Sequence, residues 1–232
     1  MVKIVPLNGI TYNQAKVSID HVIAPPYDVI SDSEQDALYN RSQYNIIRLI
    51  LNKITPEDTE CNNRYTRAAN LFETWKQENV LQRSEKPCIY YYIQNYTTPK
   101  GKKISRKGFI AGNYIETFDT KNVLPHEYTM GGPKQDRLNL TKHCKANFSQ
   151  IFMVYSDPEK EIDKAIKLPE KPFIDVTDDQ GVQNIVYIID DPDVISRVQD
   201  IMKDKTLLIA DGHHRYETSI AYREFRREQE PD

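Results

Sequence analysis

The stretch Leu207-Leu208-Ile209-Ala210-Asp211-Gly212-His213-His214-Arg215 joins a short run of branched apolar residues to a long pattern of polar and apolar residues. The apolar run is typical of a buried strand, and the longer pattern is typical of a helix. A glycine between them permits a tight turn and a close approach of the backbone to a ligand. The sequence therefore predicts a strand–turn–helix unit near the C-terminus.

This turn has the features of an anion-binding site. The first turn of a helix directs unpaired N–H groups and the positive end of its dipole at whatever lies there. His213, His214 and Arg215 add donors that suit phosphate oxygens. We expect Asp211 either to cap the helix or to face the ligand and hold Mg²⁺ against a phosphate. The competing interpretation is an ordinary Asp-Gly turn followed by solvated polar residues.

The helix after the turn is expected to bury one face and to leave residues 213–215 at an exposed mouth. The residues expected on the buried face are Tyr216, Ile220, Ala221 and Phe225.

A second group of chemically active side chains lies in residues 126–137, where a polar loop leads into a helix. His126 and Glu127 offer a base and a carboxylate, and Lys134 and Arg137 are three residues apart and so project from one side of the helix. Such a group can place a general base beside cations that neutralise phosphate. The alternative is a surface loop in which Asp136 and Arg137 merely cap and pair, as exposed charges commonly do.

Two further features are candidates. In Pro25-Pro26-Tyr27-Asp28 the prolines exclude a regular helix, so Tyr27 and Asp28 either wall a pocket or form a turn with a buried tyrosine. His126 could bind zinc together with the His213–His214 pair, although the spacing matches no closed zinc pattern.

The remaining pattern mixes hairpins with strand–helix units, which predicts an α+β (mixed α/β) fold. Ser31 or Ser33 is expected to cap a short helix. Residues 87–93 and 107–115 form a hairpin around the turn at 98–102. We expect other strands at 2–6, 45–51, 148–155, 173–176 and 182–189, and other helices at 62–80, after Pro133, and at 159–166 and 193–202. Residues 1–232 are predicted to form a single compact unit, with a division into 1–82 and 83–232 as the alternative.

Composition narrows the class of protein. The chain has 232 residues, of which 39% are hydrophobic and 28% charged, which is typical of a soluble globular protein. A formal charge of −3 provides no basic field for direct nucleic-acid binding. No apolar segment is long enough to span a membrane or to act as a secretory signal. The three cysteines form no CxxC pattern, so we expect reduced thiols and a cytoplasmic protein.

Three segments in the same order, residues 24–30, 126–140 and 210–218, resemble the domain-of-unknown-function family numbered 1015 (DUF1015). Members of that family are usually longer, so the resemblance implies that a C-terminal region is missing from this chain or that the chain is a short form.

The strand–Asp-Gly-His-His-Arg–helix turn is also similar to the phosphate-binding turn of the ParB/sulfiredoxin superfamily. That superfamily includes CTP-binding ParB proteins, sulfiredoxin and an ADP-dependent kinase of free serine. The resemblance implies a ParB/sulfiredoxin-like core with a mixed sheet, and a turn that cradles nucleotide phosphates.

Two functions follow as hypotheses. The first is an ATP- or ADP-dependent phosphotransferase acting with Mg²⁺ on a small, serine-like hydroxyl metabolite. In this hypothesis, residues 211–215 hold the phosphates and Mg²⁺. Glu127 is the base, and His126 either orients it or serves as the base instead. Further residues neutralise charge or bind the substrate, namely Lys134, Asp136, Arg137, Tyr27 and Asp28. The second is a non-catalytic nucleotide-binding module of ParB type. A metal-dependent hydrolase using His126, Glu127 and His213 is the least favoured. Oligomeric state does not follow from the sequence.

Overall fold

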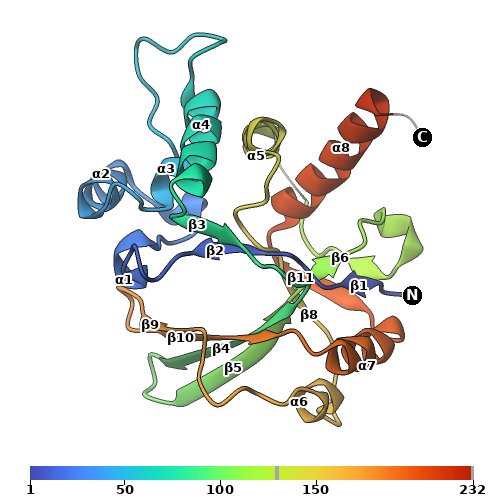
Figure 1. The fold of residues 1–232 in the computed structure, drawn as a ribbon. Helices are drawn as coiled ribbons and strands as arrows, with labels where there is room; N and C mark the ends of the chain where they lie inside the picture. The colour runs from blue at the N-terminus through green and yellow to red at the C-terminus, as the bar shows by residue number, and fades with distance from the viewer. Residues whose placement is uncertain (129–130, 231–232) are drawn as a thin grey trace. The chain divides into compact units, whose positions relative to one another are not determined.

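The computed structural model describes residues 1–128 and 131–230 and has an α+β fold (Figure 1). Its contacts group the residues into two compact units, each assembled from three segments. Unit 1 comprises Met1–Thr11, Arg83–Tyr114 and Tyr155–Leu207, and unit 2 comprises Tyr12–Gln82, Ile115–Val154 and Leu208–Asp232. The chain does pass from unit 2 to unit 1 after residue 82, where the sequence suggested a division, but it also crosses between the units at other places.

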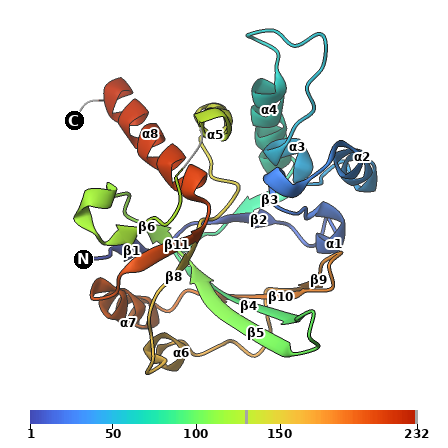
Figure 2. The ribbon, with the colours of Figure 1, turned by 180° about the vertical axis from the view of Figure 1, so that it is seen from behind.

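Unit 1 is built on a four-stranded antiparallel sheet in the order β5-β4-β10-β9 (Figure 2). Strands β4 (Ile89–Thr97) and β5 (Lys103–Ile110) form the predicted hairpin, and β9 (Ile174–Thr177) and β10 (Gln183–Ile189) complete the sheet. Helices α6 (Glu161–Ala165) and α7 (Pro192–Lys203) and the paired strands β1 (Ile4–Val5) and β6 (Gly112–Asn113) belong to the same unit.

Unit 2 contains the elements that carry the candidate site. Helix α5 (Gly131–Cys144) lies between α4 (Arg64–Gln77) and α8 (His213–Gln229) in both views and contacts each of them (Figures 1 and 2). Ala68, Leu140 and Cys144 form a buried apolar cluster between α4 and α5. A three-stranded sheet in the order β7-β11-β8 lies beside these helices, with β7 at Val123–Leu124, β8 at Phe152–Val154 and β11 at Leu207–Asp211.

The remaining elements are short. Helices α1 (Ile19–Val22), α2 (Asp32–Arg41) and α3 (Ile47–Ile50) precede α4, and strand β2 (Ile10–Tyr12) pairs with β3 (Leu81–Arg83). Single 3-10 turns form at Tyr27–Val29 and Phe118–Thr120. Within the described residues, no helix is both long and apolar enough to cross a membrane.

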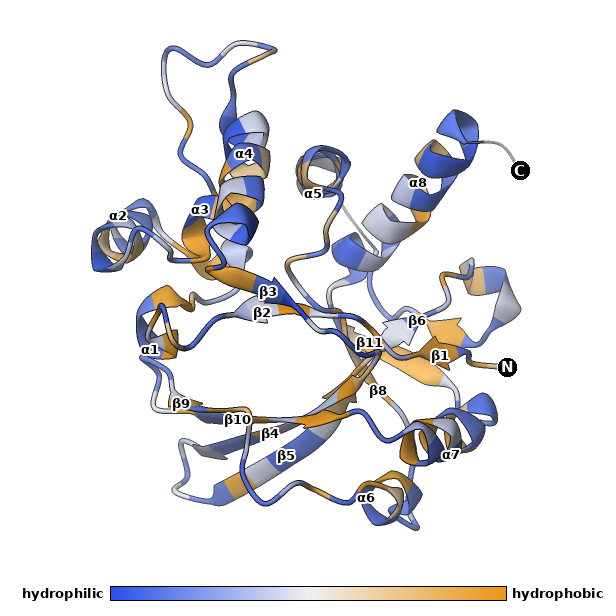
Figure 3. Cartoon of the chain, in the orientation of Figure 1, coloured by the Kyte–Doolittle hydropathy of each residue, from blue (hydrophilic) through white to orange (hydrophobic). Residues whose placement is uncertain are grey.

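The predicted strand at 45–51 is wrong, because this segment forms helix α3 (Figure 3). Ile47, Leu49 and Ile50 are all buried and Arg48 is half-buried, so burial along this run has no period that distinguishes a strand from a helix. Buried Asn45 decides the outcome. Its side chain accepts a hydrogen bond from the Ile47 backbone N–H and donates to the carbonyls of His21 and Ile23, which starts a helical turn rather than a strand.

Candidate functional site

The start of α8 differs from the starts of the long helices α2, α4 and α7. Helices α2, α4 and α7 begin with Ser31, Asn63 and Asp191, whose side chains accept hydrogen bonds from first-turn N–H groups. Helix α8 begins with Gly212 at a φ of 94° and has no side-chain cap. Its first turn contains no acidic residue either. The longest helix of the described residues therefore begins with neither a side-chain cap nor an acidic residue in its first turn.

Asp211 does not cap α8, contrary to one of the two expectations for it. It is the last residue of β11, its carboxylate is 62% exposed, and it forms an ion pair with Arg215 one turn later. The Arg215 guanidinium also donates to Ser149 Oγ and the Gln150 carbonyl. A Cβ on Gly212 would lie 2.8 Å from Arg215 Nε, so glycine is required here both for the positive φ and for the space.

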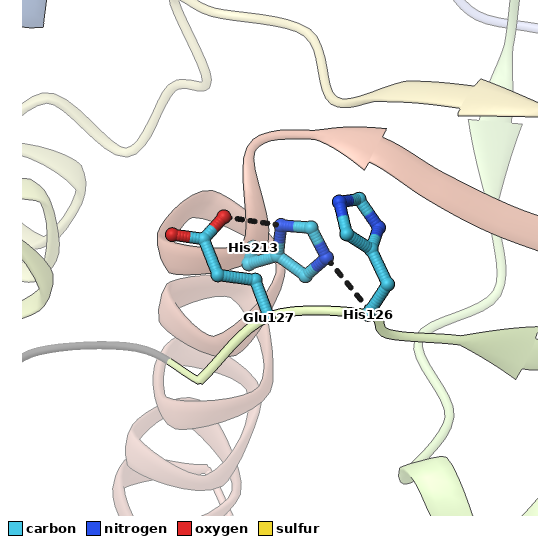
Figure 4. A group of neighbouring side chains, drawn as sticks. All are labelled: His126, Glu127 and His213. Atoms are coloured by element: carbon cyan, nitrogen blue, oxygen red, sulfur yellow. Dashed lines mark hydrogen bonds and ion pairs between the residues drawn. The ribbon is translucent and has the colours of Figure 1, made fainter.

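His213 does not lie at an exposed mouth, as the sequence analysis expected, but is 3% exposed (Figure 4). Its Nε2 accepts a hydrogen bond of 3.2 Å from the His126 backbone N–H, and its Nδ1 lies 3.6 Å from Glu127 Oε2. Because Nε2 is the acceptor, a neutral ring carries its proton on Nδ1, facing the carboxylate. The two predicted motifs therefore meet at this imidazole.

The electrostatic surroundings keep His213 neutral. Burial lowers its pKa below the usual value, and nearby His126 lowers it further, while Glu127 and Asp211 act in the opposite direction. A neutral ring with a proton on Nδ1 can orient the Glu127 side chain, which is itself 62% exposed and accessible to a ligand.

His126, Glu127 and His213 also offer donor atoms that all lie within 4.8 Å of one another, as in a metal site. The hydrogen bonding argues against that interpretation. A histidine that binds a metal through one nitrogen normally donates the N–H of its other nitrogen to an oxygen acceptor. Here Nε2 receives an N–H, which places the proton on Nδ1 and leaves no lone pair towards Glu127. We therefore interpret the group as a carboxylate–imidazole pair.

Asp136 and Arg137 form a partly buried network rather than a solvated pair. The Asp136 carboxylate accepts hydrogen bonds from Arg64, from the Tyr65 hydroxyl and from Arg137. Arg137, which is 8% exposed, also donates to the Ile50 carbonyl at 2.8 Å, and its guanidinium lies 3.8 Å from the centre of the Tyr27 ring. Burial raises the pKa of Asp136, but the charge of Arg137, the Tyr65 hydrogen bond and Arg64 together lower it below its usual value.

The other predicted residues are placed separately. Lys134 forms an ion pair of 2.8 Å with Glu217, which connects α5 to α8, so it does not project freely beside Arg137. Asp28 is exposed, and His214 is partly exposed in the first turn of α8.

A cleft of about 250 Å³ lies within unit 2. Tyr27, Arg137 and Arg215 were predicted as site residues and all line it. The sequence analysis missed Lys145, Asn147, Ser149 and Tyr222, which also line it. The α8 side of the cleft consists of Arg215, Thr218, Ser219 and Tyr222. Their helical spacing could have been recognised in the sequence, whereas the segment after α5 has no distinctive pattern.

The fold and the site define an α+β protein with an uncapped, histidine-rich helix start and an adjoining cleft. The chain belongs to the DUF1015 family, described as a protein of unknown function, whose model matches residues 4–232. No curated protein and no solved structure matches it.

Proposed function

We propose that the protein binds the phosphates of ATP or ADP at the start of α8 and transfers a phosphoryl group to a small hydroxyl metabolite. The observation that carries this proposal is the contact of the Glu127 loop with His213 in the first turn of α8. It brings a carboxylate to the end of the helix that is best suited to hold phosphate.

The residues of the first turn support an anion at this position. Basic side chains are unfavourable at the positive end of a helix, typically by about 0.3–1 kcal/mol each. His214 and Arg215 nevertheless occupy this turn, together with the neutral ring of His213, and no side chain caps it. A bound phosphate would accept hydrogen bonds from first-turn N–H groups and would favour the positive end of the helix.

Each residue then has a role in phosphoryl transfer. The acceptor oxygen attacks the terminal phosphorus, the bond from that phosphorus to the bridging oxygen breaks, and Glu127 takes the hydroxyl proton. His213 orients Glu127 through Nδ1–H, and His126 positions the ring through its backbone N–H. Arg215 and Arg137 neutralise charge beside the cleft. Mg²⁺ bound to the phosphates would find in Asp211 an exposed carboxylate ligand.

The test separates chemistry from binding. We expect Glu127→Gln to reduce phosphoryl transfer from ATP or ADP to a panel of hydroxyl metabolites by about 10²-fold or more, because the proton acceptor is lost. Nucleotide affinity, measured by calorimetry, should change little. Glu228→Gln, an exposed change near the other end of α8, is the matched control. Loss of nucleotide binding and turnover together in Glu127→Gln would contradict the role as base. Nucleotide binding by wild type without turnover on any acceptor would instead assign a regulatory module.

A further inference from the structure

The cleft in unit 2 combines a small volume with an unusual set of charges. It is bounded by α5, by the segment 145–149 that follows it, by one face of α8 and by Tyr27. Three of its lining residues carry a positive charge, namely Arg137, Lys145 and Arg215, and no lining residue is a carboxylate. We propose that this cleft binds a small organic anion that carries a hydroxyl group and no ammonium group.

The carboxylates near the cleft do not fully neutralise the cations that line it. Asp136 is shared between Arg137 and Arg64, and Asp211 pairs with Arg215. Asp28, next to Tyr27 in the chain, is a third carboxylate near the cleft. The three carboxylates Asp136, Asp211 and Asp28 therefore face four cations, namely Arg64, Arg137, Arg215 and Lys145. One positive charge therefore remains, that of Lys145, which is exposed where it lines the cleft and attracts an anion towards it.

Among the residues that the structure describes, Lys145 is the cation of this group that forms no ion pair with a carboxylate. It follows the last residue of α5, and its backbone N–H donates to the Thr141 carbonyl at 2.8 Å, as in a helix C-cap. Its φ is 50°, in the left-handed region where glycine is the usual residue. The chain therefore has a lysine side chain at the edge of the cleft in a position where a residue without a side chain would be less strained.

The walls limit the size and chemistry of the ligand. Apolar contact surface comes from Ile50, Leu140, Phe148 and the rings of Tyr27 and Tyr222, and Asn147 and Ser149 add hydrogen-bonding groups. A volume of about 250 Å³ is below the ~300–1,000 Å³ typical of drug-sized ligand pockets, which favours a compact ligand. An ammonium group would meet the same cations that attract a carboxylate. The cleft therefore fits a short hydroxy acid better than an amino acid.

The cleft also adjoins the proposed phosphate site. Arg215 is in the first turn of α8, and Ser219 and Tyr222 continue the same face of that helix along the cleft. If the proposed phosphotransferase function holds, the hydroxy acid in the cleft is the phosphoryl acceptor. The binding of an anion in the cleft does not itself depend on that function.

Calorimetry with three compact probes tests the inference. Racemic glycerate, L-serine and glycerol are similar in size, but serine carries an ammonium group and glycerol has no carboxylate. We expect glycerate to bind, and serine and glycerol to bind at least about tenfold more weakly. Glycerol loses the charge-assisted interaction of the carboxylate, and serine adds an ammonium group that the cations of the cleft repel. Glycerate that fails to bind to the wild-type protein, or serine that binds equally well, would overturn the inference.

Lys145→Gly is the informative variant, because it removes the charge and relieves the positive φ, so it is expected to fold. We expect it to weaken glycerate binding by about fivefold or more. Lys121→Gly is the matched control, since Lys121 also has a positive φ, of 59°, but does not line the cleft. Equal glycerate affinity in the two variants would contradict the inference.

Measuring ATP and ADP binding on the same samples separates this inference from the proposed function. Glycerate binding without binding of either nucleotide would support the anion cleft and reject the phosphotransferase. ADP binding without glycerate binding would reject the cleft inference alone.

Discussion

His213 is the residue through which two parts of the site, distant in the sequence, contact each other. It combines burial, a backbone N–H donor on Nε2 and a carboxylate near Nδ1. A polar residue that follows Asp-Gly is expected to be solvated, and nothing in the local sequence indicates that His213 turns inward while Arg215 faces the cleft.

The lowered pKa of His213 predicts a pH-dependent stability. Burial and His126 lower the pKa in the folded state below the unfolded value of about 6.5, so the unfolded chain binds the proton first as the pH falls. The contribution of His213 is complete above about pH 6.5 and is lost as the pH falls towards the folded pKa. In urea unfolding between pH 8 and 5, the stability difference between wild type and His213→Gln should therefore shrink at lower pH. Gln keeps an acceptor for the His126 N–H but does not titrate. A difference that is independent of pH would contradict the lowered pKa of His213.

The sequence identified which residues take part in the site better than it identified their partners. It predicted that His126, Glu127 and the turn at 211–215 act together, and the contacts of His213 with the first two are consistent with that. It did not predict that Asp136 would bind residues from α4, or that Lys134 would pair with Glu217. Side-chain type and spacing along one helix specify a face, but they do not specify which helix packs against that face.

At the scale of elements, the long periodic helices and short strands such as β9, β10 and β11 were predictable, but the segment 45–51 was not. The predicted helix at 62–80 is confirmed as α4, and its buried residues Ala68, Phe72 and Trp75 recur at the helical period. The strand predicted at 45–51 was wrong because the buried residues of this segment follow no period. The buried Asn45 side chain, which accepts a hydrogen bond from the Ile47 N–H, starts a helix there instead.

The uncapped start of α8 predicts a conflict between stability and binding. We expect His214→Glu to stabilise the ligand-free protein by about 0.5 kcal/mol, because an acidic residue in the first turn interacts favourably with the helix dipole. Urea unfolding measures this change. Asp193→His, which places a basic residue in the acidic first turn of α7, is the reciprocal control and should destabilise by a similar amount. Destabilisation by His214→Glu would contradict the view that the dipole of α8 favours a further acidic residue in its first turn, beside Asp211 and Glu127.

At the scale of the whole molecule, the network around Asp136 is the main polar connection between helices of unit 2. It joins Arg64 and Tyr65 of α4 to Arg137 of α5, and Arg137 in turn reaches the Ile50 carbonyl in α3. The assembly of each unit from three separated segments was not predictable, because hydrophobic patterns show which faces are buried and not which segments come together.

We expect Asp136→Asn to destabilise the protein by about 3–5 kcal/mol, because it leaves the buried Arg137 guanidinium without its carboxylate. Denaturant unfolding is the measurement. Asp36→Asn, which removes an exposed pair with Lys53, is the control and should cost about 0–1 kcal/mol. Equal losses of stability in the two variants would contradict the conclusion that the Asp136 network stabilises unit 2.

The central claim is that the start of α8 binds phosphate, and the measurement that tests it most directly is calorimetric titration of ADP and ATP, with Mg²⁺, into wild type and His214→Glu. The account predicts saturable binding by wild type and at least about tenfold weaker binding by the variant, since the new carboxylate occupies the positive end of the helix and repels the phosphates. Equal affinity in the two proteins, or no binding of either nucleotide to wild type, would contradict it.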